Sequence, residues 1–167
     1  KSDSAFGRSQ KIEDTTMGWR FINPKLKELY GVDTMPQTAE NVAEKFNVNR
    51  ADQDQFALAS QQRTASAQAK GFFYKEIVAV EIPQRKGDAV VIDTDEHPRA
   101  STTIEALTKL KGVVKADGTV TAGNASGIND GAAALLIASD EAVAQYQLKP
   151  RAKIIAATTV GVEPRIM

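Results

Sequence analysis

The stretch Thr119–Ala134, TVTAGNASGINDGAAA, combines three glycines with asparagine, serine and aspartate and then enters an alanine-rich apolar run. Gly123, Gly127 and Gly131 recur every four residues, a spacing that fits neither the dinucleotide fingerprint nor the Walker phosphate loop. A phosphate cradle is therefore disfavoured. Glycine also serves where a backbone closely approaches an extended ligand, and Ser126 would offer that ligand a hydroxyl. The stretch is compatible with a ligand tunnel and equally with a plain glycine-rich loop.

The composition is that of a soluble globular protein of about one domain. The 167 residues are 42% hydrophobic, and 21 basic side chains balance 21 acidic ones. Without a basic excess the chain is a poor partner for nucleic acid. It contains no run of about 20 apolar residues, the length that a membrane-spanning helix needs. Because the N-terminus lacks the apolar centre of a signal peptide, we expect a cytoplasmic protein.

The lack of cysteine limits the chemistry of these residues. With no cysteine and one histidine, the chain offers no disulfide, no thiolate zinc site, no cysteine nucleophile and no histidine-based metal set. Asp93, Asp95 and Glu96 lie in one acidic loop, but neighbouring carboxylates on a loop are more often hydrated than metal-bound. His97 follows them without a nucleophile beside it. We therefore predict no metal site and no histidine base in this loop.

Cap residues and apolar spacing predict five helices. The third of them carries Phe56, Ala59 and Ala67 on one side, and its alanine, serine and glutamine content is typical of a helix packed closely by a neighbour. We expect the aromatic run 72–74 to be core rather than a stacking platform. The five predicted helices lie within 23–31 (cap Asn23, then Pro24), 37–46, 50–70 (cap Asn49), 103–112 (cap Thr102 or Thr103) and 139–148 (cap Ser139).

Four β-branched or apolar runs are predicted as strands. Residues 76–83 and 89–95, separated by QRKGD, indicate a hairpin. The run at 132–139 fits a buried strand and a buried helix segment equally by period, and we assign it as a strand. Residues 151–162 read as another buried strand. The strand, helix, strand order from 132 to 162 implies a right-handed crossover, and so a layered α/β architecture.

Three segments together resemble the thiolases. GTVTAGNASGINDGAAA is similar to the signature of that family, and TAENVAEKFNVNRADQDQFALASQQRTASAQAKGFFYKEIVAV and DTDEHPRASTTIEALTKLKGVVKADGTVTAGN are similar to the two segments before it. The resemblance covers essentially the whole chain in the right order. DTTMGWRFINPKLKELYGVDTMPQTAENVA is closer to the β-ketoadipyl-CoA thiolases of aromatic-compound catabolism than to the acetoacetyl-CoA thiolases.

The resemblance implies that the chain is the central piece of an αβαβα-layered thiolase-like α/β fold. Residues 1–128 correspond to the loop domain, which covers the active site, shapes the coenzyme A tunnel and helps to hold the oligomer. Residues 129–148 correspond to the last strand and helix of the N-terminal half. Residues 149–167 correspond to the opening strand of the C-terminal half.

The resemblance also implies thiolysis of a 3-ketoacyl-CoA through an acyl-cysteine intermediate, with coenzyme A (CoA) as substrate and no further cofactor. In the family, the nucleophilic cysteine lies upstream of this segment, and the histidine and a second cysteine lie downstream. The chain is therefore expected to hold no catalytic residue and to be inactive alone. The whole protein is expected to form a dimer or a tetramer. The alternative is a non-catalytic acyl-CoA-binding or oligomerisation module of the same fold.

Five positions match residues that contact CoA in the family. Ser126 matches the serine that binds the pantetheine amide, with Ala122 and Ile128 on the tunnel wall. Arg99 matches an arginine over the adenine, where a guanidinium can stack on a π-face. Leu26 matches an apolar residue near the nucleotide.

Two further positions, Met35 and Met167, match residues that shape the acyl pocket. The chain departs from the family pattern nearby, because Thr34 stands where many short-chain thiolases have histidine and Pro36 stands where they have glycine. Ala106 replaces a serine that contacts CoA in some members. These differences affect the expected polarity and backbone of the pocket.

Overall fold

The computed structural model describes residues 6–8, 12, 14, 16 and 18–167. The described residues form two units, one made of those up to Ser126 together with Pro164–Met167, and the other of Gly127–Glu163. The expected domain boundaries at 128 and 148 stay predictions, and the first expected domain includes residues outside the described ones. None of the described helices is long and apolar enough to cross a membrane.

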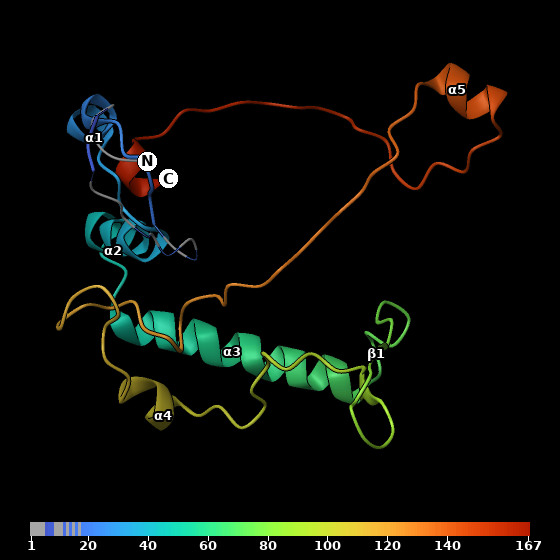
Figure 1. Ribbon diagram of the computed structural model, residues 1–167, viewed down its shortest axis with the longest axis horizontal. Helices are drawn as coiled ribbons and strands as arrows, with labels where there is room; N and C mark the ends of the chain where they lie inside the picture. The colour runs from blue at the N-terminus through green and yellow to red at the C-terminus, as the bar shows by residue number, and fades with distance from the viewer. Residues whose placement is uncertain (1–5, 9–11, 13, 15, 17) are drawn as a thin grey trace. The chain divides into compact units, whose positions relative to one another are not determined.

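Helix α1 (Pro24–Tyr30) begins and ends as its sequence predicts (Figure 1). The Asn23 side chain accepts hydrogen bonds from the backbone N–H groups of Lys25 and Leu26, at 2.9 and 3.4 Å. Pro24 occupies the first position, where a missing N–H breaks no helical bond. Gly31 ends the helix at φ 74°, in the left-handed region that glycine tolerates.

Helix α2 (Met35–Phe46) starts two residues before the predicted position. Thr34 is its N-cap, and the Thr34 backbone N–H donates to Gln37 Oε1 at 2.7 Å in a capping box. Pro36 lies in the first turn, where proline breaks no helical hydrogen bond. Thr34 and Pro36, two of the departures from the family pattern, therefore form the start of this helix.

Helix α3 (Arg50–Ala69) is the longest helix among the described residues and matches its prediction closely. The Asn49 side chain accepts a hydrogen bond from the backbone of Asp52 at 2.9 Å. The predicted apolar face is wrong at Phe56, which is 77% exposed, whereas Ala59 and Ala67 are half-buried and the buried side chain of the helix is Asp54. Polar contacts rather than an apolar stripe join α3 to its surroundings.

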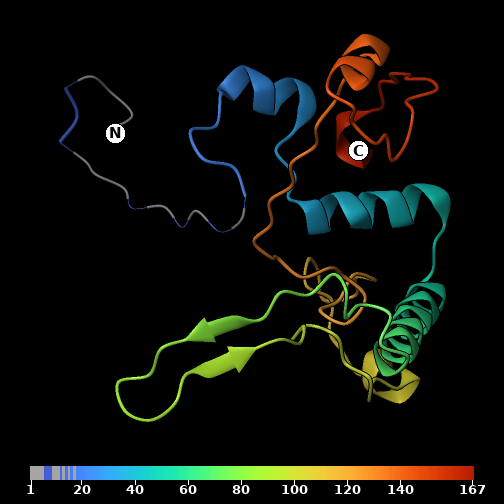
Figure 2. The same cartoon turned by 90° about the vertical axis from the view of Figure 1, so that its right-hand side faces the viewer.

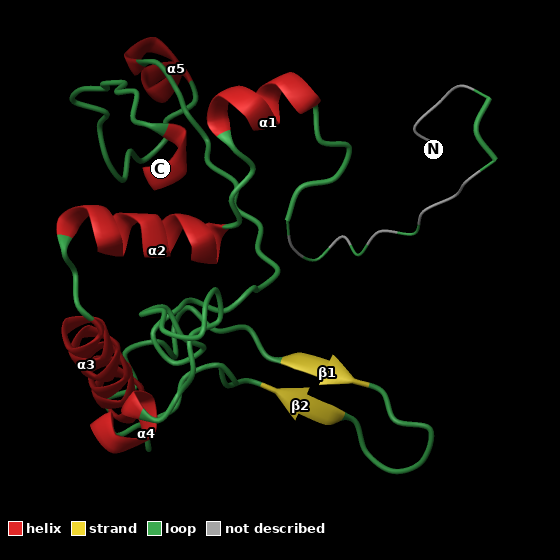
Figure 3. Ribbon diagram, turned by 90° about the vertical axis from the view of Figure 1, so that its left-hand side faces the viewer, coloured by secondary structure: helices red, strands yellow, loops and turns green. Residues whose placement is uncertain are grey.

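The predicted hairpin forms from two short antiparallel strands, β1 (Val80–Ile82) and β2 (Val90–Ile92), in the register Val80 to Ile92 (Figure 3). Both strands are shorter than the runs that predicted them, because only the residues that face each other pair. The expectation that residues 72–74 are core is wrong for two of the three, since Phe72 and Tyr74 are exposed.

Helix α4 (Ile104–Thr108) packs against α3, and a loop follows it (Figure 2). Thr103 is its N-cap, with Thr103 Oγ1 accepting from the backbone of Ala106 at 3.2 Å. The loop turns back so that Gly112 and Thr121 form an isolated antiparallel bridge. The buried apolar side chains of the described residues are Ala43, Leu107 and Val120. The buried apolar side chains of the described residues are therefore few, with one each from α2, α4 and this loop.

The short 3₁₀ helix η1 (Pro164–Ile166) packs on α2, although more than 100 residues separate them. Asn41 Nδ2 donates to the Arg165 carbonyl at 2.8 Å. Arg165 Nε donates to Asp33 Oδ2 at 2.9 Å and forms an ion pair with it. These contacts hold η1 against Asn41 in the second turn of α2 and against Asp33, just before that helix.

In the second unit, helix α5 (Asp140–Gln145) forms as predicted, with Ser139 Oγ accepting from the backbone of Ala142 at 3.2 Å. The strands predicted at 132–139 and 151–162 are wrong for this structure, since neither segment pairs in the described chain. Leu136 and Ile155 are 84% and 86% exposed. A strand exists only when a neighbouring strand takes its backbone hydrogen bonds, and these segments have none. The layered arrangement inferred from them is therefore absent from the described residues.

Candidate functional site

The loop after α4 is closed by one of its own side chains. The Thr121 backbone N–H donates to Asn124 Oδ1 at 2.7 Å, and Asn124 Nδ2 donates to the Thr119 carbonyl at 2.9 Å. The Gly123 N–H donates to Thr121 Oγ1 at 3.2 Å, and Thr121 is fully buried. Every one of these bonds uses backbone, so they specify the path of the chain from 119 to 124.

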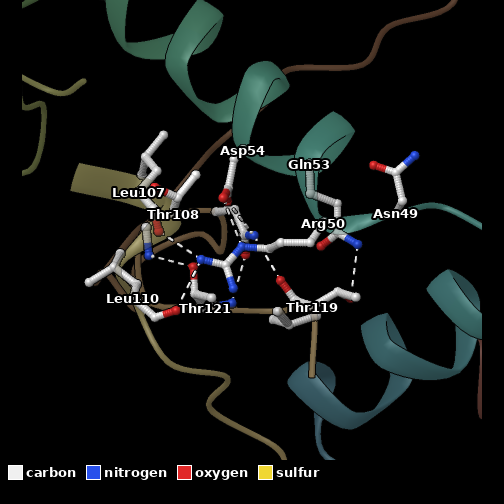
Figure 4. A network of polar contacts seen from close by, with 12 residues as sticks. Asn49, Arg50, Gln53, Asp54, Leu107, Thr108, Leu110, Thr119 and Thr121 are labelled. Carbon is white, nitrogen blue, oxygen red and sulfur yellow. Dashed lines mark hydrogen bonds and ion pairs between the residues drawn. The ribbon is translucent and has the colours of Figure 1, made fainter. Parts of the chain in front are cut away.

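Asp54 of α3 fastens this loop to the helix (Figure 4). Its Oδ1 accepts from Asn124 Nδ2 at 3.0 Å, and its Oδ2 accepts from Arg50 Nε at 2.8 Å. Arg50 Nη2 reaches further and donates to the carbonyls of Leu107 and Leu110, at 2.7 and 3.0 Å. Asp54 is 0% exposed. A buried carboxylate is tolerated only with such charge-assisted partners.

Glu40 of α2 holds the other side of the same loop. Glu40 Oε1 accepts from the Val120 backbone N–H at 2.7 Å, and Glu40 Oε2 accepts from Thr119 Oγ1 at 3.1 Å. Gln53 Nε2 donates to the same Thr119 hydroxyl at 2.9 Å. Glu40 is 4% exposed. Two helices thus hold the loop through buried side chains.

Glycine is required where this loop meets its neighbours. A Cβ on Gly123 would lie 2.5 Å from Leu110 Cδ1 and 2.6 Å from Leu107 Cδ2. A Cβ on Gly118 would lie 2.5 Å from Glu40 Oε1. A Cβ on Gly131 would meet nothing within 4 Å. At Gly123, the close approach that the glycine-rich stretch predicts is therefore an approach to the protein's own side chains, and Gly118, just before that stretch, makes a similar approach.

The predicted CoA-binding residues of the loop are exposed. Ala122 lies within the fastened segment, and Ser126 follows Asn124 by two residues at the end of the same unit. Both are open to solvent. Ile128 is exposed as well and belongs to the second unit.

Arg99 is fastened by its backbone and leaves its side chain at the surface. The Arg99 N–H donates to Gln61 Oε1 of α3 at 2.8 Å, and the Thr102 hydroxyl donates to the Arg99 carbonyl at 2.7 Å. The Arg99 residue is exposed. Leu26 is half-buried on α1. Gln61 and Asp54 of α3 thus hold Arg99 and the loop that leads to Ser126, whereas Leu26 lies on α1.

The elements that carry the predicted acyl-pocket residues lie together. Met35 is the first residue of α2, and Met167 follows η1, which packs on that helix. Both methionines are exposed. Near Met35 in the sequence, the Arg165 guanidinium and then the Asn41 amide hold the pKa of the Asp33 carboxyl below its ordinary value. Asp33 is thus an anion at neutral pH, paired with Arg165.

The acidic loop remains open to solvent. Asp93, Asp95, Glu96 and His97 are all exposed. No group of three or more acidic, histidine or cysteine side chains among the described residues could hold a metal ion.

Ala106 stands where some family members have a CoA-contacting serine. It lies in the first turn of α4, and its backbone N–H donates to the Thr103 cap.

The network of Glu40, Arg50, Asp54 and Asn124 was not predicted from the sequence. Arg50 and Asp54 have the i, i+4 spacing of a helical ion pair, which is a visible signal. Glu40 and Asn124 give no such sequence signal, because their partners lie 80 and 70 residues away along the chain.

Comparison with known proteins agrees with the sequence motifs. Residues 2–141 match the family described as Thiolase, N-terminal domain. The chain is 83% identical over 167 residues to a beta-ketoadipyl-CoA thiolase of Acinetobacter baylyi, and it covers 42% of that protein. It therefore spans less than half the length of this curated relative.

Solved structures agree as well. An acetyl-CoA acetyltransferase of Bacillus anthracis matches with a TM-score of 0.73 and 36% identity, over 97% of this chain and 40% of that one. Human mitochondrial 3-ketoacyl-CoA thiolase in complex with CoA matches with a TM-score of 0.60 and 45% identity, over 70% of this chain and 28% of that one. The family match and these structures confirm the expected resemblance and the thiolase-like fold class, while the layered sheet of that fold is not formed among the described residues.

Proposed function

Because the chain belongs to the thiolase family, we propose that it is the central part of a protein that cleaves 3-oxoadipyl-CoA with CoA into succinyl-CoA and acetyl-CoA. The substrate assignment is supported by the 83% identity to a protein named beta-ketoadipyl-CoA thiolase. The chain matches only 42% of that relative and contains no cysteine. The reacting thiol therefore has to come from outside these residues.

The proposed reaction has two steps. A cysteine thiolate attacks the 3-keto carbon, the bond between C2 and C3 breaks, and the leaving enolate takes up a proton to become acetyl-CoA. The thiol of CoA then attacks the succinyl thioester and regenerates the cysteine. In both steps the thioester end of CoA lies at the reacting centre, while its pantetheine and nucleotide parts are held away from it. Holding those parts of CoA is the work that we assign to this chain.

One structural observation carries that assignment: α3 fastens both segments that are expected to contact CoA. Asp54 binds the loop that leads to Ser126, and Gln61 binds the backbone of Arg99. Positions seven apart lie on the same face of a helix, with about 10 Å between them along its axis. We propose that the Ser126 hydroxyl binds the pantetheine amide and that Arg99 lies over the adenine.

Activity measurements test the proposal. The complete protein is expected to consume 3-oxoadipyl-CoA in the presence of CoA, followed as loss of the 3-keto thioester, and to prefer it over acetoacetyl-CoA. The 167-residue chain is the matched control and is expected to show no turnover, because a methionine thioether cannot form a thioester.

Three results would contradict parts of this proposal. Turnover by the short chain would show that the nucleophile lies within it. Preference for acetoacetyl-CoA would support thiolysis as the reaction but contradict 3-oxoadipyl-CoA as the substrate. A complete protein that binds CoA and leaves thioesters intact would support the non-catalytic acyl-CoA-binding module instead. The oligomeric state and the cytoplasmic location stay predictions.

A further inference from the structure

The side chains that hold the Ser126 loop cannot themselves touch a ligand. Asp54 is 0% exposed and Glu40 is 4% exposed, and each oxygen of both carboxylates accepts a hydrogen bond from the chain. Asn124 is likewise occupied, since its amide bonds Asp54, Thr119 and Thr121. Any effect of these groups on a bound molecule has to pass through the loop backbone.

The buried anchors can affect a bound molecule by fixing the conformation of the loop backbone. Ser126 follows Asn124 by two residues, so the direction of its hydroxyl depends on the path that the Asn124 amide imposes. A loop already held in one conformation does not have to be ordered when a ligand binds, and this raises the affinity without adding a contact. The two anchors approach from different helices and act on different residues of the loop, Thr119 and Val120 for Glu40 and Asn124 for Asp54.

We propose that Asp54 is a positioning residue for CoA binding, acting through Asn124 on the loop that carries Ser126, and that Glu40 supports the same loop from α2. The proposal rests on the proposed function, because it takes Ser126 as the CoA contact. It assigns a role to a buried carboxylate that makes no contact with substrate. The role is specific to CoA and leaves the acyl-transfer step itself unchanged.

The test is a double-mutant cycle in the complete protein, with KM for CoA as the readout. Asp54→Asn leaves one acceptor oxygen for two donors, Arg50 Nε and Asn124 Nδ2, so the loop loses an anchor. Ser126→Ala removes the proposed contact. We expect Ser126→Ala to raise KM for CoA by about 2- to 10-fold, the usual worth of one hydrogen bond. We expect Asp54→Asn to raise it by no more than that amount, with kcat nearly unchanged.

The double variant distinguishes positioning from general loss of structure. If Asp54 acts through Ser126, the Ser126→Ala/Asp54→Asn protein has the same KM for CoA as Ser126→Ala alone. Asp52→Asn is the matched control, because it makes the same chemical change on an exposed residue of α3. The Asp52 carboxylate accepts a hydrogen bond from the Asn49 side chain rather than from the loop. We expect this control to keep the wild-type KM.

Each contrary result has a separate meaning. An unchanged KM for CoA in Ser126→Ala contradicts the proposed contact between Ser126 and CoA. A normal KM in Asp54→Asn, or single effects that multiply in the double variant, overturns the positioning role and leaves the CoA contact intact.

A milder variant keeps the test decisive if Asp54→Asn folds poorly. Thr119→Val preserves the shape of the side chain and removes the hydroxyl that joins Gln53 to Glu40. We expect it to raise KM for CoA in the wild-type background and not in the Ser126→Ala background. An equal rise in both backgrounds overturns the proposal.

Discussion

Single glycines decide how closely the loop can pack. Gly123 lies so near Leu107 and Leu110 that an added Cβ would come within 2.6 Å of both. Leu107 is one of the buried apolar side chains of the described residues. Its side chain therefore has little room to move away from a methyl group at position 123.

We predict that Gly123→Ala destabilises the protein by about 1–3 kcal/mol, the usual cost of overpacking a filled site. Urea denaturation gives the change in the free energy of unfolding. Gly131→Ala is the control, because its Cβ would meet nothing within 4 Å and its φ lies outside the left-handed region. We expect the control to be neutral or slightly stabilising, since alanine restricts the unfolded chain. Equal losses in both variants would contradict the packing argument.

The residues of the candidate site were predictable to different degrees. Ser126 and Arg99 follow from family motifs, and their roles stay predictions. Glu40 and Asp54 are charged residues on helices, and such residues are usually solvated. Glu40 and Asp54 bind the loop of residues 119–124, which lies against both helices. No local sequence pattern predicts that this distant loop packs there. Gly123 belongs to a stretch for which the sequence predicted a close approach to a ligand, whereas the close approach of Gly118 and the side chains that both glycines meet were not predicted.

At the level of elements, helices were predicted better than strands. The caps Asn23, Asn49 and Ser139 bond residues two or three positions away, so the sequence around each of them contains the whole interaction. Residues 132–139 and 151–162 are apolar enough for strands, but a strand needs a partner elsewhere in the chain. Composition alone does not supply one.

The contact between α2 and η1 is expected to depend on pH. Because pairing with Arg165 lowers the pKa of Asp33 in the folded state, the pair stabilises at pH values above the unfolded aspartate pKa of about 3.9. This stabilisation is lost as the pH falls through the lowered pKa. Arg165 is 57% exposed in this pair, so its worth is about 0.2–1 kcal/mol.

Nuclear magnetic resonance can follow this contact directly. In the wild-type protein we expect the Asp33 carboxyl to titrate below an ordinary aspartate, with the amide signals of Arg165 and Met167 changing at the same pH. In Asp33→Asn those two amides should no longer respond. Asp88→Asn, at an exposed turn between β1 and β2, should leave their response intact. An ordinary titration of Asp33 would contradict the ion pair.

For the whole molecule, family and fold class could be inferred from the sequence, whereas much of the three-dimensional arrangement could not. The motifs between 38 and 134 are specific because each is a long run of residues in a set order, and the family match confirms them. The layered sheet is a property of strands that meet, and the described residues supply one paired hairpin. A chain that matches 42% of its relative contains the motifs of a fold without all of its contacts.

The two extended apolar segments of the second unit have a consequence for handling the chain. Residues around Leu136 and Ile155 are exposed, uncharged and rich in aliphatic side chains, with backbone groups free to join another β-strand. Such segments promote amyloid-like association between copies. We expect the 167-residue chain to aggregate on concentration, and Leu136→Lys or Ile155→Lys to delay the onset in light scattering. Gln145→Lys, which adds the same charge on exposed α5, should not delay it, and an equal delay would assign the effect to net charge.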